Sequence, residues 1–299
     1  MPIDAVLPAF LIAAVGYLAG KKFRLDTQTL SRVCLYILVP ALTFNSLVTS
    51  KVDLRVAWRV VLAALIFPFA QIALFLPLFR LLKWDQTRSR AMLLSSIFTN
   101  AGNYGLPVCL FAFGQEGMDL GVVFMVAQTL MVYSLGVYIA ASSQMSPGTA
   151  MKQVLRMPAV YAAVAGMIVR TMDVPIPDIL GRPMGLLSQA AVPVFLLLLG
   201  LQLIGSGGSR ESWKVPLIVV PLRLVVAPVI AGLIGTAIGL SGLAWKILVL
   251  QGAMSTPVNA MVIAQEFGAE PATVSRVTAA STVASVLTLT LWIMALRAF

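Results

Sequence analysis

The chain has 299 residues, of which 60% are hydrophobic and only 11% are charged. Soluble domains carry about 25% charged residues because their surfaces face water, so this composition excludes an ordinary soluble protein and predicts a chain that lies in lipid. The absence of histidine and the two isolated cysteines exclude zinc sites, histidine-based triads and a disulfide framework, and the net charge of +10 points to membrane topology before nucleic acid.

The first apolar segment, residues 3–20, is predicted to be a retained membrane span and not a signal peptide. No basic residue precedes it, whereas Lys21, Lys22 and Arg24 follow it directly. A signal peptide has its basic residues on the other side of the apolar run. Because basic residues favour the cytoplasmic side, the N-terminus is predicted to lie outside.

Apolar segments of this kind recur along the whole chain. A helix needs roughly 20 apolar residues to cross a bilayer. All five tryptophans lie at or near the predicted span ends, where indole rings favour the headgroup layer. We therefore predict an all-α polytopic membrane protein with ten transmembrane helices. The predicted spans are residues 3–20, 30–50, 56–80, 91–113, 120–142, 158–172, 183–205, 216–240, 245–267 and 273–296.

The basic residues divide unequally between the two sides of these spans. Thirteen fall on one side and seven on the other, and Arg223 lies inside span 8. The positive-inside rule assigns the richer side to the cytoplasm. Both termini are therefore predicted to lie outside, and the expected location is a bacterial cytoplasmic (inner) membrane.

The two halves of the chain resemble each other, with matching strings about 150 residues apart. Each half holds five predicted spans, and because five is odd the second copy enters the membrane upside down, as in many secondary transporters. The predicted units are residues 1–142 and 158–299, joined by a short cytoplasmic connector at 143–157. The matching pairs are Gly16 with Gly166, Pro40 with Pro193, and Pro107 with Pro257.

Span 4 carries residues that interrupt a helix at the depth of the membrane centre. Its middle reads TNAGNYGLPV, residues 99–108. Gly is flexible, Pro removes a backbone donor, and Asn is costly in lipid unless it is paired. Irregular backbone persists at this depth only when it is buried in protein or lines a wet cavity.

Span 9 has a second interruption at Ser255, Thr256 and Pro257. Thr followed by Pro is typical of a helix start, so Thr256 is predicted as the N-cap and Pro257 as the first residue of a new half-helix. If the broken helices 4 and 9 cross, the second half of each directs free N–H groups and a positive dipole end to the membrane centre. Two such ends predict an anion site.

Neutral polar side chains near the two breaks are the candidates for substrate binding. The alternative for each is structural, in which the side chain satisfies a carbonyl that the kink has freed. Asn45 in span 2 and Gln128 in span 5 are weaker candidates. The main candidates are Asn100, Asn103, Tyr104, Pro107, Ser255, Thr256, Pro257 and Asn259.

The charged residues constrain how transport is driven. Arg223 either snorkels to the headgroups or supplies a fixed positive charge that offsets substrate charge or braces the broken helices. All eleven acidic residues lie at span ends or in loops, so neither a mid-membrane carboxylate nor a histidine can carry a coupling proton. We expect no metal site, no cofactor, and potential-driven uniport, with sodium bound by neutral oxygens as an open alternative.

The string at 99–108, together with STPVNAMVIAQEFGAEPATVS at 255–275, resembles the auxin efflux carrier family, the PIN-type transporters and their shorter bacterial relatives. The resemblance extends over the whole chain, without the long central loop of the plant carriers. It implies the crossover fold shared with bile acid:sodium symporters, with a scaffold of helices 1, 2, 6 and 7 and a transport domain of helices 3–5 and 8–10. It further implies an elevator-like motion, a homodimer, and contact between Asn100 and the substrate carboxylate.

Together these observations predict a secondary transporter that moves a small organic anion by elevator-type alternating access. The resemblance points to malate, malonate or an auxin-like indole acid. One alternative is a sodium- or proton-coupled symporter of the bile-acid type, and a more remote one is a non-transporting membrane sensor. An enzyme is not expected, because the chain has no HExxH, GxSxG or P-loop motif, and no nucleic-acid partner is expected.

Overall fold

The computed structural model describes residues 3–141, 155, 157–204 and 213–298. Every regular element in these residues is an α-helix or a short π-helix, labelled α and η. Most of the predicted connector at 143–157 lies outside the described residues. In the first half the elements are α1 (Ile3–Phe23), α2 (Thr27–Val33), η1 (Cys34–Leu38), α3 (Val39–Thr49), α4 (Leu54–Leu81), α5 (Gln86–Ile97), η2 (Ala101–Gly105), α6 (Leu106–Met131), η3 (Val132–Gly136) and α7 (Val137–Ala140).

The second half has the same character. Its elements are α9 (Pro158–Thr171), α10 (Asp178–Gln202), α11 (Lys214–Pro221), η4 (Leu222–Val226), α12 (Ala227–Ala237), α13 (Gly242–Gly252), α14 (Val258–Glu266) and α15 (Pro271–Ala298).

The helices form an integral membrane protein. Within the described residues, seven helical segments are long and apolar enough to cross a bilayer, and α9 is a shorter apolar helix. Large apolar side chains face outward, and Leu18, Leu217 and Ile179 are 63%, 71% and 81% exposed. In water such a surface would drive aggregation, so lipid is its natural solvent.

Each predicted span coincides with helix, but two coincide with more complex structure. The segment Gln86–Ala140 is 55 residues long and covers two predicted spans. It contains non-helical backbone at 98–100 and a sharp kink at Gly114. The predicted span 245–267 consists of α13 and α14, separated by irregular backbone at 253–257. Ten membrane crossings therefore stay a prediction.

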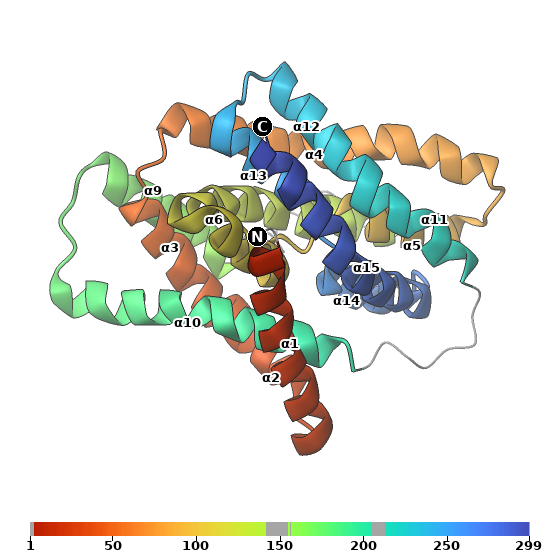
Figure 1. Ribbon diagram of the computed structural model, residues 1–299, viewed down its shortest axis with the longest axis horizontal. Coiled ribbons are helices and arrows are strands. Elements are labelled where there is room, and N and C mark those ends of the chain that lie inside the picture. The colour runs from red at the N-terminus through yellow and green to blue at the C-terminus, as the bar shows by residue number, and fades with distance from the viewer. Residues whose placement is uncertain (1–2, 142–154, 156, 205–212, 299) are drawn as a thin grey trace.

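Two helix pairs approach each other closely, α1 with α10 and α3 with α9. Figure 1 shows α1 crossing α10 at the lower edge, while α4 lies along the opposite edge. A Cβ atom added at Gly16 of α1 would overlap the Leu197 carbonyl of α10. The second pair is α3 with α9, where Gly166 of α9 lies against Phe44 and Leu47 of α3. Small residues allow such close approach between membrane helices.

Three of the four π-helices occur immediately before a proline in the second position of the next helix. The prolines are Pro40 in α3, Pro107 in α6 and Pro228 in α12. Proline has no N–H and its ring collides with the carbonyl four residues earlier. A wider turn relieves this collision, so the chain continues through the proline without a full break.

Two of the described glycines with positive φ directly follow a phenylalanine. Gly114 has φ 71° at the kink inside α6, and Gly268 has φ 67° between α14 and α15. The left-handed region is accessible to glycine without a steric penalty, which explains the residue type at both turns.

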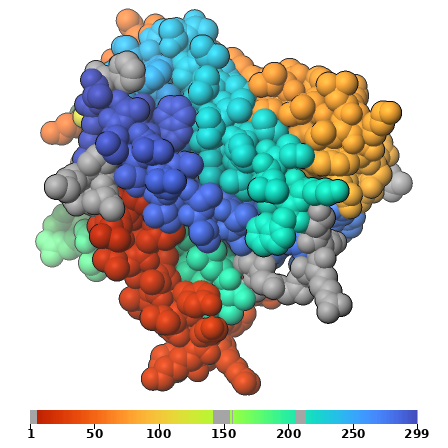
Figure 2. Space-filling view, turned by 45° about the vertical axis from the view of Figure 1, so that its right-hand side comes forward, coloured from red at the N-terminus to blue at the C-terminus, as the bar shows by residue number. Residues whose placement is uncertain are grey.

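The N-terminal helices project from the rest of the molecule, in red at the lower end of Figure 2. Asp26 begins α2 there, accepting hydrogen bonds from the Thr29 hydroxyl and from the backbone N–H groups of Gln28 and Thr29. These bonds, the hydroxyl first, lower the pKa of the Asp26 carboxyl. The N-cap fixes the start of a helix that leads to the cavities described next.

Candidate functional site at the crossing of two helix breaks

The two stretches of irregular backbone meet inside the molecule. Asn100 donates its backbone N–H to the Ser255 carbonyl at 2.9 Å. The Thr256 hydroxyl donates to the Ser95 carbonyl of α5 at 2.6 Å, and its backbone N–H bonds to the Ser281 hydroxyl of α15 at 3.1 Å. Residues about 150 positions apart in the chain thus satisfy each other's backbone groups at the crossing, where water is scarce.

The start of α14 differs from the prediction by one residue. The N-cap is Pro257, whose side chain makes no capping bond, and the helix begins at Val258. Thr256 was predicted as the N-cap, and that prediction is wrong because its hydroxyl donates to Ser95 instead. The buried Ser95 carbonyl in the last turn of α5 competes for this hydroxyl and fixes its direction. The prediction of a new half-helix at this point is confirmed.

A small cavity lies at the crossing. Its volume is about 80 Å³, enough for a small carboxylate or a few water molecules. A second cavity of about 330 Å³ shares several lining residues with the first, among them Asn103, Tyr133 and Asn259. The larger cavity reaches Gln28 and Arg32 of α2. Among the described residues that line the two cavities, Arg32 is the only charged one.

Five of the predicted site residues line the small cavity. Their side chains differ in burial, since Asn100 is 5% exposed, Gln128 is 2% exposed and Asn259 is exposed. The remaining polar side chains of the lining are Thr99, Thr129 and Tyr133, which the sequence reasoning did not select. The five predicted residues brought together are Asn100, Asn103, Gln128, Pro257 and Asn259.

Asn100 is the most informative of these residues. It is the N-cap of η2, with φ −76° and ψ 59°, so the chain turns at this position. Its carbonyl accepts the Gly105 N–H at 2.9 Å, which closes the π turn. Its side-chain Nδ2, however, has no hydrogen-bond partner among the described residues. A buried donor without a protein partner is costly, so this N–H group is available to an acceptor that binds in the cavity.

Four predicted residues do not line the small cavity, and three of them hold the crossing together through hydrogen bonds. The Ser285 hydroxyl donates to Tyr104 at 3.2 Å, and Thr282 donates to Ser255 at 3.1 Å. Both bonds attach the breaks to α15. The four residues are Tyr104, Pro107, Ser255 and Thr256, all of them buried.

Asn45 lies elsewhere. It lines a separate cavity of about 480 Å³ between α1, α3, α6 and α10, and its Nδ2 donates to the Ser188 hydroxyl at 3.4 Å. Nearby, the buried carboxylate of Asp119 in α6 accepts hydrogen bonds from Ser46 at 2.7 Å and from Gln115 at 2.9 Å. Asp119 is near a predicted span end, as expected, but it is only 6% exposed.

Arg223 is completely buried behind the crossing. Its guanidinium donates to the carbonyls of Met254 at 2.9 Å, Gly252 at 2.5 Å and Ser96 at 3.2 Å. It also donates to Gln71 Oε1 at 3.1 Å. The snorkelling alternative for Arg223 is therefore wrong, since its side chain points into the protein and touches both broken helices.

Gln71 of α4 was missed by the sequence reasoning. It is completely buried, and besides receiving the Arg223 bond it donates to the Ile97 carbonyl at 3.1 Å. The available signal was a lone glutamine in the middle of an apolar segment, a position where an amide is retained only if it finds a partner.

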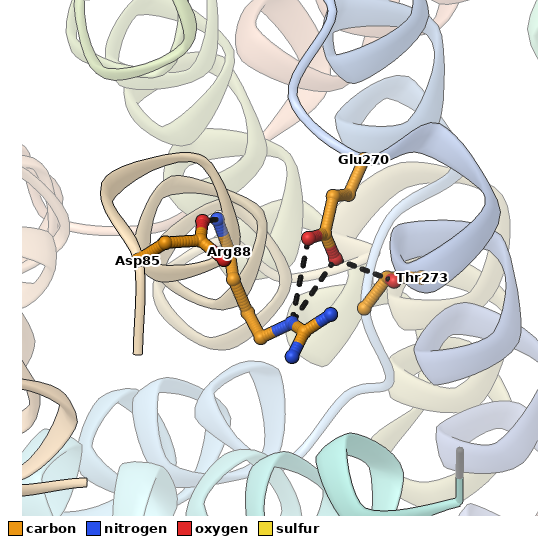
Figure 3. Close-up of polar contacts among 4 residues, drawn as sticks. All are labelled: Asp85, Arg88, Glu270 and Thr273. Carbon is orange, nitrogen blue, oxygen red and sulfur yellow. Dashed lines mark hydrogen bonds and ion pairs between the residues drawn. The ribbon is translucent and has the colours of Figure 1, made fainter. Parts of the chain in front are cut away.

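An ion pair joins the start of α5 to the residue that precedes α15. Figure 3 shows Arg88 of α5 pointing toward Glu270, with Nε to Oε1 at 3.4 Å. Glu270 also accepts the Thr273 hydroxyl at 2.8 Å, and Asp85 caps the start of α5 by accepting the Arg88 backbone N–H at 2.8 Å. The start of α5 is thereby tied to the start of α15.

Known proteins with similar sequences are transporters. The sequence matches the membrane transport protein family over residues 2–153 and 144–293. An uncharacterized transporter of Methanothermobacter thermautotrophicus is 29% identical over 297 residues, covering 97% of this chain and 96% of the relative. An uncharacterized transporter of Methanocaldococcus jannaschii is 25% identical over 311 residues, covering 98% of both chains. Since the family match extends over almost the entire chain, this protein belongs to the membrane transport protein family, that of the auxin efflux carriers, and is a transporter and not an enzyme.

Proposed function

We propose that the protein is a secondary transporter that binds a small organic anion at the crossing and moves it by elevator-type alternating access. The observation that carries the proposal is the buried, unpartnered Nδ2 of Asn100 in a cavity beside the N-terminal ends of η2 and α14. Amide and helix N-terminal N–H groups donate to a carboxylate without a buried countercharge. Malate, malonate and an indole acid are the substrates to test first, and the small cavity favours the dicarboxylates.

We propose ten membrane spans in two inverted repeats, 1–142 and 158–299. Counting 91–113 and 120–142 as separate spans, and α13 with α14 as one, gives ten. Gly16 and Gly166 support the repeat, because each brings the first helix of one half against the second helix of the other. The left-handed glycines Gly114 and Gly268 add a further pair at a similar spacing.

In this architecture the scaffold consists of spans 1, 2, 6 and 7, which are α1, α2 to α3, α9 and α10. The transport domain consists of spans 3–5 and 8–10, which are α4 to α7 and α11 to α15. The joined cavities lie between the two parts and open at the Arg32 end, which carries the larger number of basic residues. The positive-inside rule assigns this end to the cytoplasm, so the arrangement is inward-open with both termini outside. A homodimer in a cytoplasmic membrane completes the proposal.

The driving force that the site supports is the membrane potential. The groups that line the small cavity are neutral, and the buried carboxylate of Asp119 does not line it but bonds to Ser46 of α3. A potential of 100 mV contributes about 2.3 kcal/mol per charge to anion movement. Uniport of the anion therefore needs no coupled ion.

Sodium coupling is a second candidate, favoured by two buried oxygens. Thr99 Oγ1 and Gln128 Oε1 both belong to residues of the small cavity, and neither has a hydrogen-bond partner among the described residues. Neutral oxygens of this kind are suitable ligands for a hard cation. Proton coupling and a sensor that binds without transport are the remaining alternatives, and the same experiment separates all of them.

The test is a ligand-binding screen followed by flux measurements. Purified protein is heated with malate, malonate or indole-3-acetate, each with and without sodium, because a bound ligand raises the unfolding temperature. Uptake into proteoliposomes is then measured with an imposed potential, sodium gradient or proton gradient. We expect Asn100→Ala, Asn103→Ala and Asn259→Ala to weaken binding roughly tenfold to a hundredfold, the effect of losing a hydrogen bond to a charged group.

The control is Thr290→Ala on the far face of α15, where the hydroxyl bonds only to the carbonyl of its own helix. It is expected to bind and transport like the unaltered protein. Normal transport in all three asparagine variants would exclude the site, flux that requires a sodium or proton gradient would replace uniport by symport, and binding without flux would support a sensor.

A further inference from the structure

The two broken helices share one positively charged residue that does not reach the cavity. Arg223 lies in η4, is completely buried, and is absent from the residues that line either cavity at the crossing. Its hydrogen bonds and its ring contact in the described residues are with the end of α5, with the end of α13 and the segment that follows it, and with α4. Its effect on a bound ligand must therefore pass through these helices or through the electric field.

The carbonyls that receive its hydrogen bonds lie at helix C-termini. Ser96 is in the last turn of α5, Gly252 is the last residue of α13, and Met254 lies two residues beyond it. The C-terminus of a helix carries a partial negative charge and has carbonyls without partners. Arg223 therefore caps both first half-helices at once and neutralises their negative ends.

Gln71 fixes the orientation of the guanidinium. Its Oε1 accepts from Arg223, and its Nε2 donates to the Ile97 carbonyl, the last residue of α5. The Phe67 ring, one turn before Gln71 in α4, also contacts the guanidinium, with its centroid 5.9 Å from the guanidinium carbon. The cluster of Arg223, Gln71 and the helix ends is thus held by contacts from α4, α5, α13 and η4.

The charge of Arg223 is not cancelled by an acid at this cluster. Its four acceptors are neutral oxygens, three carbonyls and one amide. The carboxylate of Asp119, which is buried, bonds to Ser46 and Gln115 instead. With the negative helix ends neutralised, the positive N-terminal ends of η2 and α14 act on the cavity unopposed, and the guanidinium adds its own field.

We propose that Arg223 is a positioning residue which, together with Gln71, clamps the two broken helices and sets the preference of the cavity for negatively charged ligands. The inference rests on the proposed function, because it assigns the source of the anion preference at that same site. The ligand class that it favours most is the dicarboxylate, since the attraction grows with ligand charge.

The test compares ligands of equal shape and different charge in Arg223→Gln, Arg223→Lys and Gln71→Met. Dissociation constants are measured for malonate, its monoanionic half-amide and neutral malonamide. For Arg223→Gln we expect affinity to fall about tenfold per unit of ligand charge, so that malonate loses more than its half-amide and malonamide is unchanged; tenfold corresponds to about 1.4 kcal/mol. Arg223→Lys keeps the charge and is expected to stay within about threefold of the unaltered protein, on the same scale.

Arg59→Gln is the matched control, because Arg59 also donates to a carbonyl beyond a helix end, Gly239 after α12, but on the exposed surface. It should leave all three affinities unchanged. A merely structural role for Arg223 predicts equal loss for all three ligands, or equal loss in the Gln and Lys variants, and either result would overturn the proposal.

The clamp has a second readout that needs no ligand. Without the guanidinium, or without the Gln71 amide that orients it, backbone hydrogen exchange at the ends of α5 and α13 should rise, so we expect an increase in Arg223→Gln and in Gln71→Met but not in Arg59→Gln. If the unaltered protein bound no carboxylate, the proposed function would fail while exchange still tested the clamp. Unchanged exchange in both variants would exclude it.

Discussion

Arg32 is the charged side chain that an anion entering the joined cavities would meet first. It is exposed on α2, whereas the asparagines at the crossing are neutral. A positive group at the mouth of a cavity raises the local concentration of anions, and this attraction is weakened by salt.

We expect Arg32→Gln to raise the KM for anion uptake severalfold at low ionic strength and to have little effect at high ionic strength, with kcat nearly unchanged. Uptake into proteoliposomes at two salt concentrations measures this. Lys22→Gln removes an exposed basic residue from the end of α1 and serves as the control. An equal rise in KM at both salt concentrations would contradict a long-range role and indicate direct contact.

The amino-acid sequence predicts which polar residues lie at the crossing better than it predicts what each of them contacts there. Asn100, Asn103 and Asn259 do line the small cavity, since they flank the breaks that create it. Thr256 could not be assigned correctly, because its acceptor at Ser95 is 161 residues away and no local pattern reveals it. Asn45 likewise depends on which face of α3 meets α10, a matter of tertiary packing.

At the scale of helices, the close contact of α1 with α10 depends on the absence of a side chain at Gly16. An added Cβ meets backbone of α10, which cannot move aside as a flexible side chain could. Gly185 in α10 offers the opposite environment, because nothing lies within 4 Å of a Cβ placed there.

We expect Gly16→Ala to destabilise the protein by about 1–3 kcal/mol, the usual effect of overpacking, and to lower its unfolding temperature in detergent. Gly185→Ala should be neutral or stabilising by up to about 1 kcal/mol, because alanine favours a helix interior more than glycine does. Equal unfolding temperatures for the two variants would contradict the close packing of α1 on α10.

The location of the helices could be predicted from apolar runs, but their local form could not. Pro40, Pro107 and Pro228 are plain in the sequence, yet the chain meets each with a π turn and continues as helix. In the described residues, irregular backbone separates the helices before Ala101 and before Val258, where backbone from the other half supplies a hydrogen-bond partner. Whether a proline bends, widens or breaks a helix is decided by those tertiary partners.

At the scale of the molecule, the hydrogen bond between Ser46 and Asp119 crosses from the proposed scaffold to the proposed transport domain. It lies on the side of the protein away from Arg32, beside the cavity that contains Asn45. An elevator motion must break this contact in every cycle, because α3 and α6 slide past one another.

We expect a disulfide between Ser46→Cys and Asp119→Cys to stop transport, with recovery on reduction. The native Cys34 and Cys109, both buried and free, are first replaced by alanine. Ligand binding from the Arg32 side should persist in the oxidised protein, since the joined cavities are left open. Flux is measured in proteoliposomes under oxidising and reducing conditions, and full transport by the cross-linked protein would exclude relative movement of α3 and α6.

The pair formed by Gln71 and Arg223 has a consequence for how such a chain could arise. The two residues are 152 positions apart, close to the spacing of the proposed repeats, so the proposed architecture makes them equivalent positions that touch each other. In an ancestor made of two identical copies, this position would face itself. Two glutamines can pair there, whereas two buried arginines would repel one another. The arginine is therefore compatible only with a fused chain whose halves had become free to differ, and its charge marks the loss of the original symmetry.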